Sequence, residues 1–134
     1  MPGWVPPPRP GPDVLEGRWA RLERLDPARH GREVHAANRA SDALWDFMPY
    51  GPFADEAGWR AWAEGVAPLA DPVFYAVRDR GTGRAAGVMS FLRIDPGAGS
   101  IEVGHIALAP ALQRTRAATD AAALMMGWAF GAGY

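Results

Sequence analysis

Hydrophobic positions with a period of two dominate the second half of the chain. They fall in residues 73–78, 86–94 and 100–108, and short turns rich in Gly, Asp and Pro separate the three segments. Alternation bounded by such turns predicts consecutive strands, so we expect an antiparallel three-stranded meander. A looser alternation of apolar and charged residues over positions 15–25 predicts one earlier strand.

Two helices are expected between the first strand and the meander. Asp26-Pro27 combines a capping side chain with proline at the first helical position, which predicts a helix running to about residue 39. Asp55 caps a second helix that ends near residues 65–68. Its apolar residues recur at i, i+3, i+4 and i+7, which gives it one buried face.

The last segment predicts a closing helix over about 116–130, with Gly131 and Gly133 as its C-cap and the following turn. Residues 1–14 are rich in Pro and Gly and predict an extended arm without packed structure of its own. Residues 15–134 then form one domain of the α/β (α+β) class.

Composition narrows the functional classes. The net charge of −1 gives no support to a nucleic-acid or anionic-membrane surface. The chain has no cysteine, so disulfides and thiolate metal sites are excluded, and its three histidines lack metal-ligand spacing, so no metal is expected. No apolar run is long enough to span a membrane, and the N-terminus does not resemble a secretory signal, which indicates a cytoplasmic protein.

A strand, a short loop with two arginines and a helix N-terminus follow one another over residues 100–127. Arg114 and Arg116 lie where cations are disfavoured, because a helix N-terminus already carries partial positive charge. Their presence is better explained if an anion binds there, with the backbone N–H groups of residues 115–118 pointing at it. The alternative is a pair of solvated surface arginines.

Glu102 is a carboxylate within an apolar strand, where it is costly unless paired or functional. One hypothesis is a general base, and the other is an ion pair with an arginine on a neighbouring strand, such as Arg93. Gly104 predicts a bulge or a close approach of a ligand to the backbone. Strict alternation places Ile101, Val103 and His105 on one face of the strand and Glu102, Gly104, Ile106 and Leu108 on the other.

The segment 45–53 is aromatic and interrupted by Pro and Gly. It is either a wall of a substrate site or a loop whose rings cover the core.

With these elements in place, the order strand, two helices, meander, anion loop, helix resembles the GNAT superfamily of acetyl-CoA-dependent N-acetyltransferases. The segments LEGRWARLERLDPARH, LWDFMPYGPF and IEVGHIALAPALQRTRAATDA are similar, more narrowly, to the ribosomal-protein N-terminal acetyltransferases of the RimJ/RimL type. The resemblance covers residues 15–134 and implies the acyl-CoA N-acyltransferase fold, a mostly antiparallel sheet flanked by helices.

The resemblance implies a site for coenzyme A. Residues 113–118 align with the family pattern Q/R-x-x-G-x-G/A, whose amides hold the diphosphate. Arg116 replaces the central glycine of the pattern, and Arg114 stands where many relatives carry a further glycine. These two replacements put the loop conformation in question if the backbone needs a positive φ there. The implied coenzyme-binding residues are Ile106, Ala107 and Leu108 along the strand and Gln113, Arg114, Thr115, Arg116, Ala117, Ala118 and Thr119 in the loop and helix.

The resemblance also implies chemistry. Glu102 matches the strand carboxylate that deprotonates an acceptor amine, often through water, while an amide near Ile106 or Ala107 polarises the thioester carbonyl. The segment containing Trp45, Phe47, Tyr50 and Phe53 matches a loop that contacts the acceptor. The acceptor is a protein N-terminus or a small-molecule amine, and a homodimer is compatible with this interpretation.

Family members continue past the closing helix with a fifth strand, a fourth helix and two more strands. We therefore expect the chain to be a C-terminally truncated GNAT domain, with an unpaired edge on strand 100–108 and weak or absent activity alone. Two alternatives stay open. One is a non-catalytic remnant that binds a coenzyme A-like anion or a partner chain, and the other is a small α/β binding module without a nucleotide.

Overall fold

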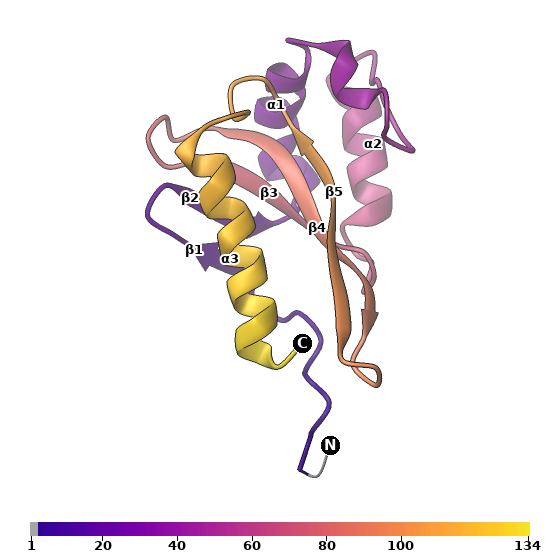
Figure 1. Ribbon diagram of the computed structural model, residues 1–134. Helices are drawn as coiled ribbons and strands as arrows, with labels where there is room; N and C mark the ends of the chain where they lie inside the picture. Colours follow the sequence, from indigo (N-terminus) through magenta and orange to yellow (C-terminus); the bar gives the residue numbers. More distant parts are fainter. Residues whose placement is uncertain (1–2) are drawn as a thin grey trace.

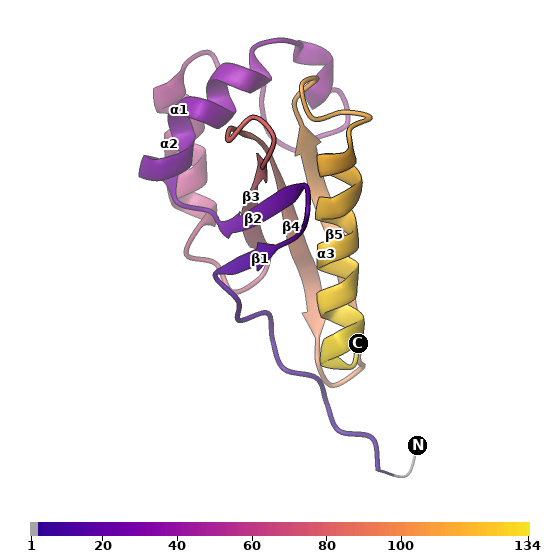
Figure 2. The same cartoon turned by 90° about the vertical axis from the view of Figure 1, so that its left-hand side faces the viewer.

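A five-stranded antiparallel sheet lies between two layers of helix in the computed structural model, which describes residues 3–134. Figure 2 shows α1 and α2 on one side of the sheet and α3 on the other. The strands follow the order β1-β2-β3-β4-β5, so each pairs with its neighbour in sequence (Figure 1). The elements are β1 (Val14–Glu16), β2 (Ala20–Arg24), α1 (Pro27–Asn38), the short 3-10 helix η1 (Asp42–Trp45), α2 (Glu56–Val66), β3 (Val73–Asp79), β4 (Ala85–Asp95), β5 (Ser100–Leu108) and α3 (Arg116–Ala132).

The predicted helix starts are confirmed by their caps. The Asp26 carboxylate accepts hydrogen bonds from Ala28 N at 2.9 Å and Arg29 N at 3.1 Å, and Asp55 accepts from Gly58 N at 2.8 Å. The end of α3 differs from the prediction. Gly133, in the left-handed conformation with φ 103°, is the C-cap, whereas Gly131 lies inside the helix.

The prediction of one strand over residues 15–25 is wrong, because this segment folds back as the β1–β2 hairpin. The turn is fixed by Asp120 of α3, whose carboxylate accepts the N–H groups of Trp19 at 2.6 Å and Ala20 at 2.9 Å. A side chain at Gly17 would collide with that carboxylate, so glycine permits the close approach.

Two apolar cores form on the two faces of the sheet. Leu22, Tyr75 and Phe91 are fully buried with Met125 of α3 on one face, while Trp59 of α2 belongs to the core on the other. Of the predicted arm over residues 1–14, residues 4–12 have no helix or strand, Val14 begins β1, and residues 1 and 2 lie outside the described residues. The arm is tied to the domain by hydrogen bonds from the Tyr75 hydroxyl to Pro12 O and from the Tyr134 hydroxyl to Pro8 O.

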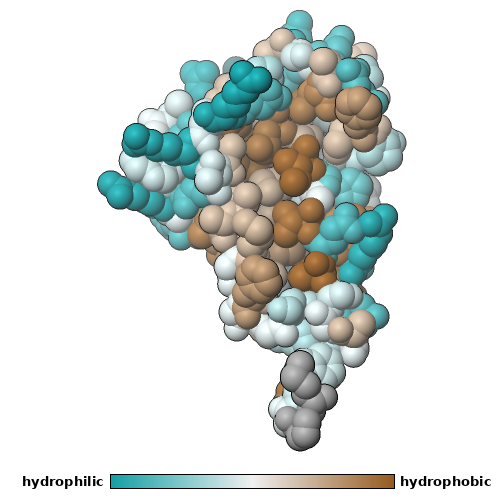
Figure 3. All heavy atoms as spheres, in the orientation of Figure 1, coloured by the Kyte–Doolittle hydropathy of each residue, from teal (hydrophilic) through white to brown (hydrophobic). Residues whose placement is uncertain are grey.

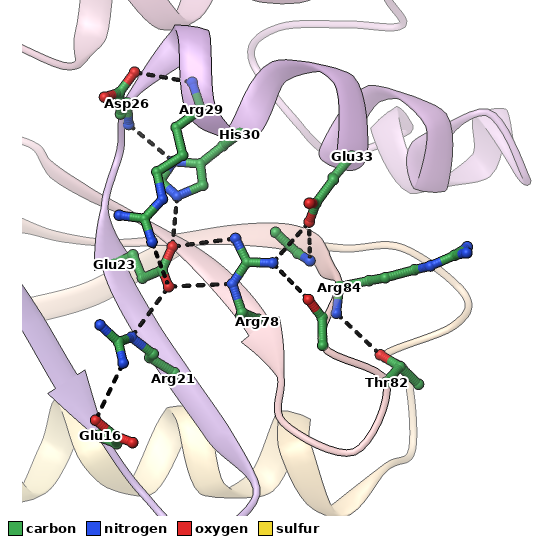
Figure 4. A network of polar contacts seen from close by, with 12 residues as sticks. Glu16, Arg21, Glu23, Asp26, Arg29, His30, Glu33, Arg78, Thr82 and Arg84 are labelled. Carbon is green, nitrogen blue, oxygen red and sulfur yellow. Dashed lines mark hydrogen bonds and ion pairs between the residues drawn. The ribbon is translucent and has the colours of Figure 1, made fainter.

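A buried network of charges joins β2, α1 and β3 (Figure 4), and no local sequence pattern predicts it. Glu23, with a side chain only 4% exposed, accepts from His30 Nε2 at 2.8 Å and from Arg78 Nε at 3.2 Å. His30 Nδ1 accepts the Asp26 N–H at 3.0 Å, so the ring proton lies on Nε2 and is donated to Glu23. The network locks the first helix to the centre of the sheet.

Candidate functional site

The loop before α3 is a tight turn built from its own backbone. Leu112 N donates to Ala109 O at 2.8 Å, and Gln113 Nε2 donates to Leu108 O at 2.9 Å, which ties the loop to the end of β5. Thr115 is the N-cap of α3, and its hydroxyl oxygen accepts the Ala118 N–H at 3.2 Å. The strand, loop and helix N-terminus are therefore held in one fixed arrangement.

Arg114 has the backbone conformation that this turn demands. Its φ is +60°, in the left-handed region that glycine adopts readily and an L-residue adopts at a cost of about 1–2 kcal/mol. The loop thus has a positive φ although the glycine is missing. Strain of this kind persists where the surroundings impose it, and it is concentrated at functional sites.

The backbone donors of this turn divide into two groups. Thr115 N donates to Leu112 O, and Ala118 N is capped by Thr115, so two of the four amides predicted to face an anion are already satisfied. The amides of Arg116 and Ala117 have no hydrogen-bond acceptor within residues 3–134. Arg116 is exposed, whereas Ala117 is 3% exposed, so of these two unpaired N–H groups that of Arg116 is the more accessible to a ligand.

An open hollow of about 410 Å³ lies beside the helix N-terminus and carries a positive balance of charge. Its lining residues are Trp19, Arg114, Thr115, Arg116, Thr119, Asp120 and Ala123. Neither Arg114 nor Arg116 has an ion-pair partner in the described part of the chain. The Arg116 guanidinium lies 5.0 Å from the centre of the Trp19 ring, and Asp120 is engaged with backbone amides. This chemistry suits an anion.

The strand leading to the loop bulges at its centre. Val88 pairs with Ala107 but Ser90 pairs with Gly104, so β5 has one more residue than β4 in this interval, and His105 has a φ of +47°. The bulge near Gly104 confirms the expectation from that glycine. The prediction that Val103 and His105 share one face of the strand is therefore wrong. Val103 packs toward α3, whereas the His105 ring contacts Phe74 in the opposite layer, because the extra residue inverts the alternation.

β5 is an edge strand whose pairing in residues 3–134 is with β4 alone. Figure 3 shows an apolar stripe on the face where α3 lies beside β5. Exposed apolar side chains on these elements include Ile106, which is 49% exposed, and Met126, which is 48% exposed. Of the strand residues predicted to contact coenzyme A, Ile106 is exposed, Leu108 is partly buried and Ala107 is fully buried, so Ala107 can contribute only its backbone.

Glu102 forms the ion pair that was one of its two alternatives, with Oε2 lying 2.5 Å from Arg93 Nη1. The other carboxylate oxygen, Oε1, has no hydrogen bond to the described residues. It lies over Gly104, 3.3 Å from the position that a Cβ atom would take if residue 104 had a side chain. His105 follows on the same face. Burial lowers the pKa of His105, Glu102 acts in the opposite direction, and Arg93 lowers it further.

Three of the four predicted acceptor-contacting aromatics gather over this bulge. Tyr50 stacks on His105 with ring centres 5.7 Å apart, and Trp45 and Phe53 pack edge-to-face at 5.3 Å. The Tyr50 hydroxyl is buried without a partner in the described chain, and burial raises its pKa. Phe47 is 98% exposed and stands apart from this cluster.

The family model for the acetyltransferase (GNAT) domain matches residues 21–133. The chain belongs to the GNAT acetyltransferase family. A GCN5-related N-acetyltransferase from Brucella melitensis is 36% identical with a TM-score of 0.95, over 100% of this chain and 62% of that one. A probable acetyltransferase of the GNAT family from Chromobacterium violaceum ATCC 12472 is 32% identical with a TM-score of 0.91, over 100% of this chain and 68% of that one.

This GNAT domain therefore spans 62% of the length of the Brucella relative. A ribosomal-protein-S5-alanine acetyltransferase from Vibrio fischeri, 17% identical over 89% of this chain and 68% of that one with a TM-score of 0.59, shares the fold alone. None of the curated proteins matches the chain.

Some contacts between residues of the candidate site in this GNAT domain were not predicted from the sequence. Tyr50 and His105 meet although 55 positions separate them, and Trp19 reaches the anion loop through the β1–β2 turn. Only the lone Gly104 signalled the bulge. Within residues 3–134, no group of His, Asp and Glu could hold a metal ion, and no helix has the length and apolarity to cross a membrane.

Proposed function

We propose that this chain forms the acetyl-CoA-binding part of an N-acetyltransferase that acetylates an amine. The observation that carries the proposal is Arg114, which takes a left-handed conformation directly before the capped N-terminus of α3. The turn retains the geometry that glycine would favour and adds a cation to it.

The residues present fit a coenzyme A diphosphate. The free amides of Arg116 and Ala117 point out of the first turn of a helix, where the dipole favours an anion. The Arg114 and Arg116 guanidinium groups add charge-assisted hydrogen bonds, and Gln113 fixes the loop to the strand. Thr119 completes the wall of the hollow, while the backbone of residues 106–108 would follow the pantetheine arm.

When bound, acetyl-CoA would supply a thioester carbonyl for attack by the amine nitrogen. The new C–N bond forms, the C–S bond breaks, the amine loses one proton, and coenzyme A leaves as a thiolate that takes a proton from solvent. In our proposal Glu102 accepts that proton, directly or through a water, on the oxygen that Arg93 leaves free. A backbone N–H near Ile106 or Ala107, at the bulge, stabilises the charge that develops on the carbonyl oxygen. Trp45, Tyr50 and Phe53 form the wall against which the acceptor binds, and Phe47, which is exposed and apart from them, would contact the acceptor only at its solvent side.

The acceptor is a protein N-terminus or a small-molecule amine. The segments resembling the RimJ/RimL branch favour the first of these. Because β5 pairs with β4 alone within residues 3–134, we also propose that this chain by itself has weak or no transferase activity, and that a homodimer would use the open edge of β5.

Thermal unfolding with and without acetyl-CoA tests the proposal. A ligand that binds the native state at one hundred times its dissociation constant stabilises it by about 2.7 kcal/mol, so the melting temperature should rise with concentration. Arg116→Ala should weaken the shift, whereas Arg84→Ala removes an exposed arginine on the β3–β4 turn and serves as the control. If millimolar acetyl-CoA leaves the melting temperature unchanged, the coenzyme site is refuted.

A further inference from the structure

The turn between β1 and β2 places a further arginine against Trp19, which is one wall of the hollow beside α3. Figure 2 shows this turn next to the first turns of α3. The Arg18 Cζ atom lies 4.8 Å from the centre of the Trp19 ring, and the Arg116 Cζ atom lies 5.0 Å from the same point. One indole ring therefore holds together a cation from the turn and a cation from the start of the helix.

The acidic side chains near this pair of cations are engaged elsewhere. Neither Arg18 nor Arg116 forms an ion pair within residues 3–134. Asp120 lines the hollow, but its carboxylate accepts two backbone N–H groups of the turn. Glu16, at the end of β1, pairs with two other arginines. The hollow therefore keeps an excess of positive charge on the side of the turn.

Two cations held on one ring repel each other. Both guanidinium groups lie about 5 Å from one point, so their separation is no larger than the Debye length of about 10 Å at 0.1 M salt. An anion bound between them would replace this repulsion by charge-assisted hydrogen bonds. A phosphate monoester suits the place, because it offers three acceptor oxygens and up to two charges to the planar guanidinium forks.

Coenzyme A carries such a phosphate monoester. The group is the 3′-phosphate of the adenosine, and it lies on the ribose whose 5′-oxygen bears the diphosphate, so one sugar ring separates the two anions. The hollow of about 410 Å³ offers two neighbouring places for them, namely the start of α3 with Arg114 and the Trp19 wall. Arg116 belongs to both places, because it begins α3 and its guanidinium lies against Trp19.

We propose that Arg18 and Arg116 bind the 3′-phosphate of the coenzyme and thereby select acetyl-CoA over acetyl-dephospho-CoA. The inference rests on the proposed function, since it requires the diphosphate at the start of α3. It adds Arg18 as a residue that determines specificity for the donor. The β1–β2 hairpin then contributes to donor binding as well as to the sheet.

The test is isothermal titration calorimetry of the 134-residue chain with acetyl-CoA and with acetyl-dephospho-CoA, in a buffer without phosphate. We expect the parent chain to bind acetyl-CoA about tenfold more tightly, because the missing phosphate takes its charge-assisted hydrogen bonds with it. Arg18→Ala should lose most of this preference and leave the Kd for acetyl-dephospho-CoA unchanged. Arg18→Lys keeps the charge without the planar fork and should retain part of the preference.

The control is Arg84→Ala, which removes an exposed arginine on the β3–β4 turn and should keep the whole preference. Because the Arg18 side chain is exposed, Arg18→Ala without ligand should melt at the temperature of the parent chain. Equal Kd values of the two coenzymes for the parent chain would overturn the inference and leave the coenzyme site standing. Binding of neither coenzyme would refute the coenzyme site and the inference with it. An equal loss of affinity for both coenzymes in Arg18→Ala, or a loss of the preference in Arg84→Ala, would contradict the role of Arg18.

Discussion

Replacing Glu23 by glutamine should destabilise the domain in a manner that depends on pH. Burial alone would raise the pKa of this carboxyl, but hydrogen bonds from Arg78 and His30 and the charges of Arg78 and Arg29 outweigh it and lower the pKa from 4.5 to about 2. A shift of this size corresponds to about 3 kcal/mol of stability at neutral pH. Because the folded-state pKa is the lower one, this contribution is present above about pH 4.5 and is lost as the pH falls toward 2.

The assay is urea unfolding of the parent chain and of Glu23→Gln, followed by tryptophan fluorescence between neutral pH and the acid limit of folding. The difference in unfolding free energy between the two chains should be largest near neutrality and shrink below about pH 4.5. Glu33, whose pKa is lowered chiefly by the hydrogen bond from the Ala85 N–H, is present in both chains. Glu102→Gln removes a solvent-exposed ion pair and should cost about 1 kcal/mol or less. If the unfolding free energies of the parent chain and of Glu23→Gln differ by the same amount at pH 3 as at pH 7, the electrostatic explanation is refuted.

Three further substitutions test other parts of the structure. Gly17→Ala places a methyl group against the Asp120 carboxylate and should lower stability by about 1–3 kcal/mol in urea unfolding; a neutral effect would contradict the anchored turn. Arg114→Gly relieves the positive φ and should leave the melting temperature equal or higher while weakening acetyl-CoA binding; a marked loss of stability would mean that the left-handed conformation is wrong. Phe91→Ala empties a fully buried site and should cost about 3–5 kcal/mol, and a cost near zero would contradict the packing between the sheet and α3.

Features set by neighbouring residues could be predicted from the sequence. The caps at Asp26 and Asp55, the meander and the start of α3 were predicted because each depends on a few adjacent side chains. The β1–β2 hairpin could not be predicted in this way. The residue that holds its turn, Asp120, lies 101 positions from Trp19, and no local pattern announces such a contact.

The same distinction applies to the candidate site. The alternation of β5 predicted which residues share a face only as far as the bulge, because one extra residue reverses every face beyond it. Gly104 indicated that the strand is irregular there, but it did not indicate which side chains the bulge moves to the other face. Similarly, Glu23, His30 and Arg78 each appear unremarkable in the sequence, and they form one buried network only when β2, α1 and β3 meet.

The loop before α3 is held by both local and long-range contacts, and this explains how Arg114 can adopt a positive φ. Thr115 and Gln113 hold the loop by contacts within a few residues, so the backbone is forced into the turn whatever occupies position 114. Trp19, in the turn between β1 and β2, lies against the Arg116 guanidinium, which restricts where that cation can lie. An arginine in this setting costs strain but contributes charge. In the coenzyme site proposed above, glycine at position 114 would contribute the conformation alone, whereas arginine exchanges some stability for electrostatic attraction of an anion.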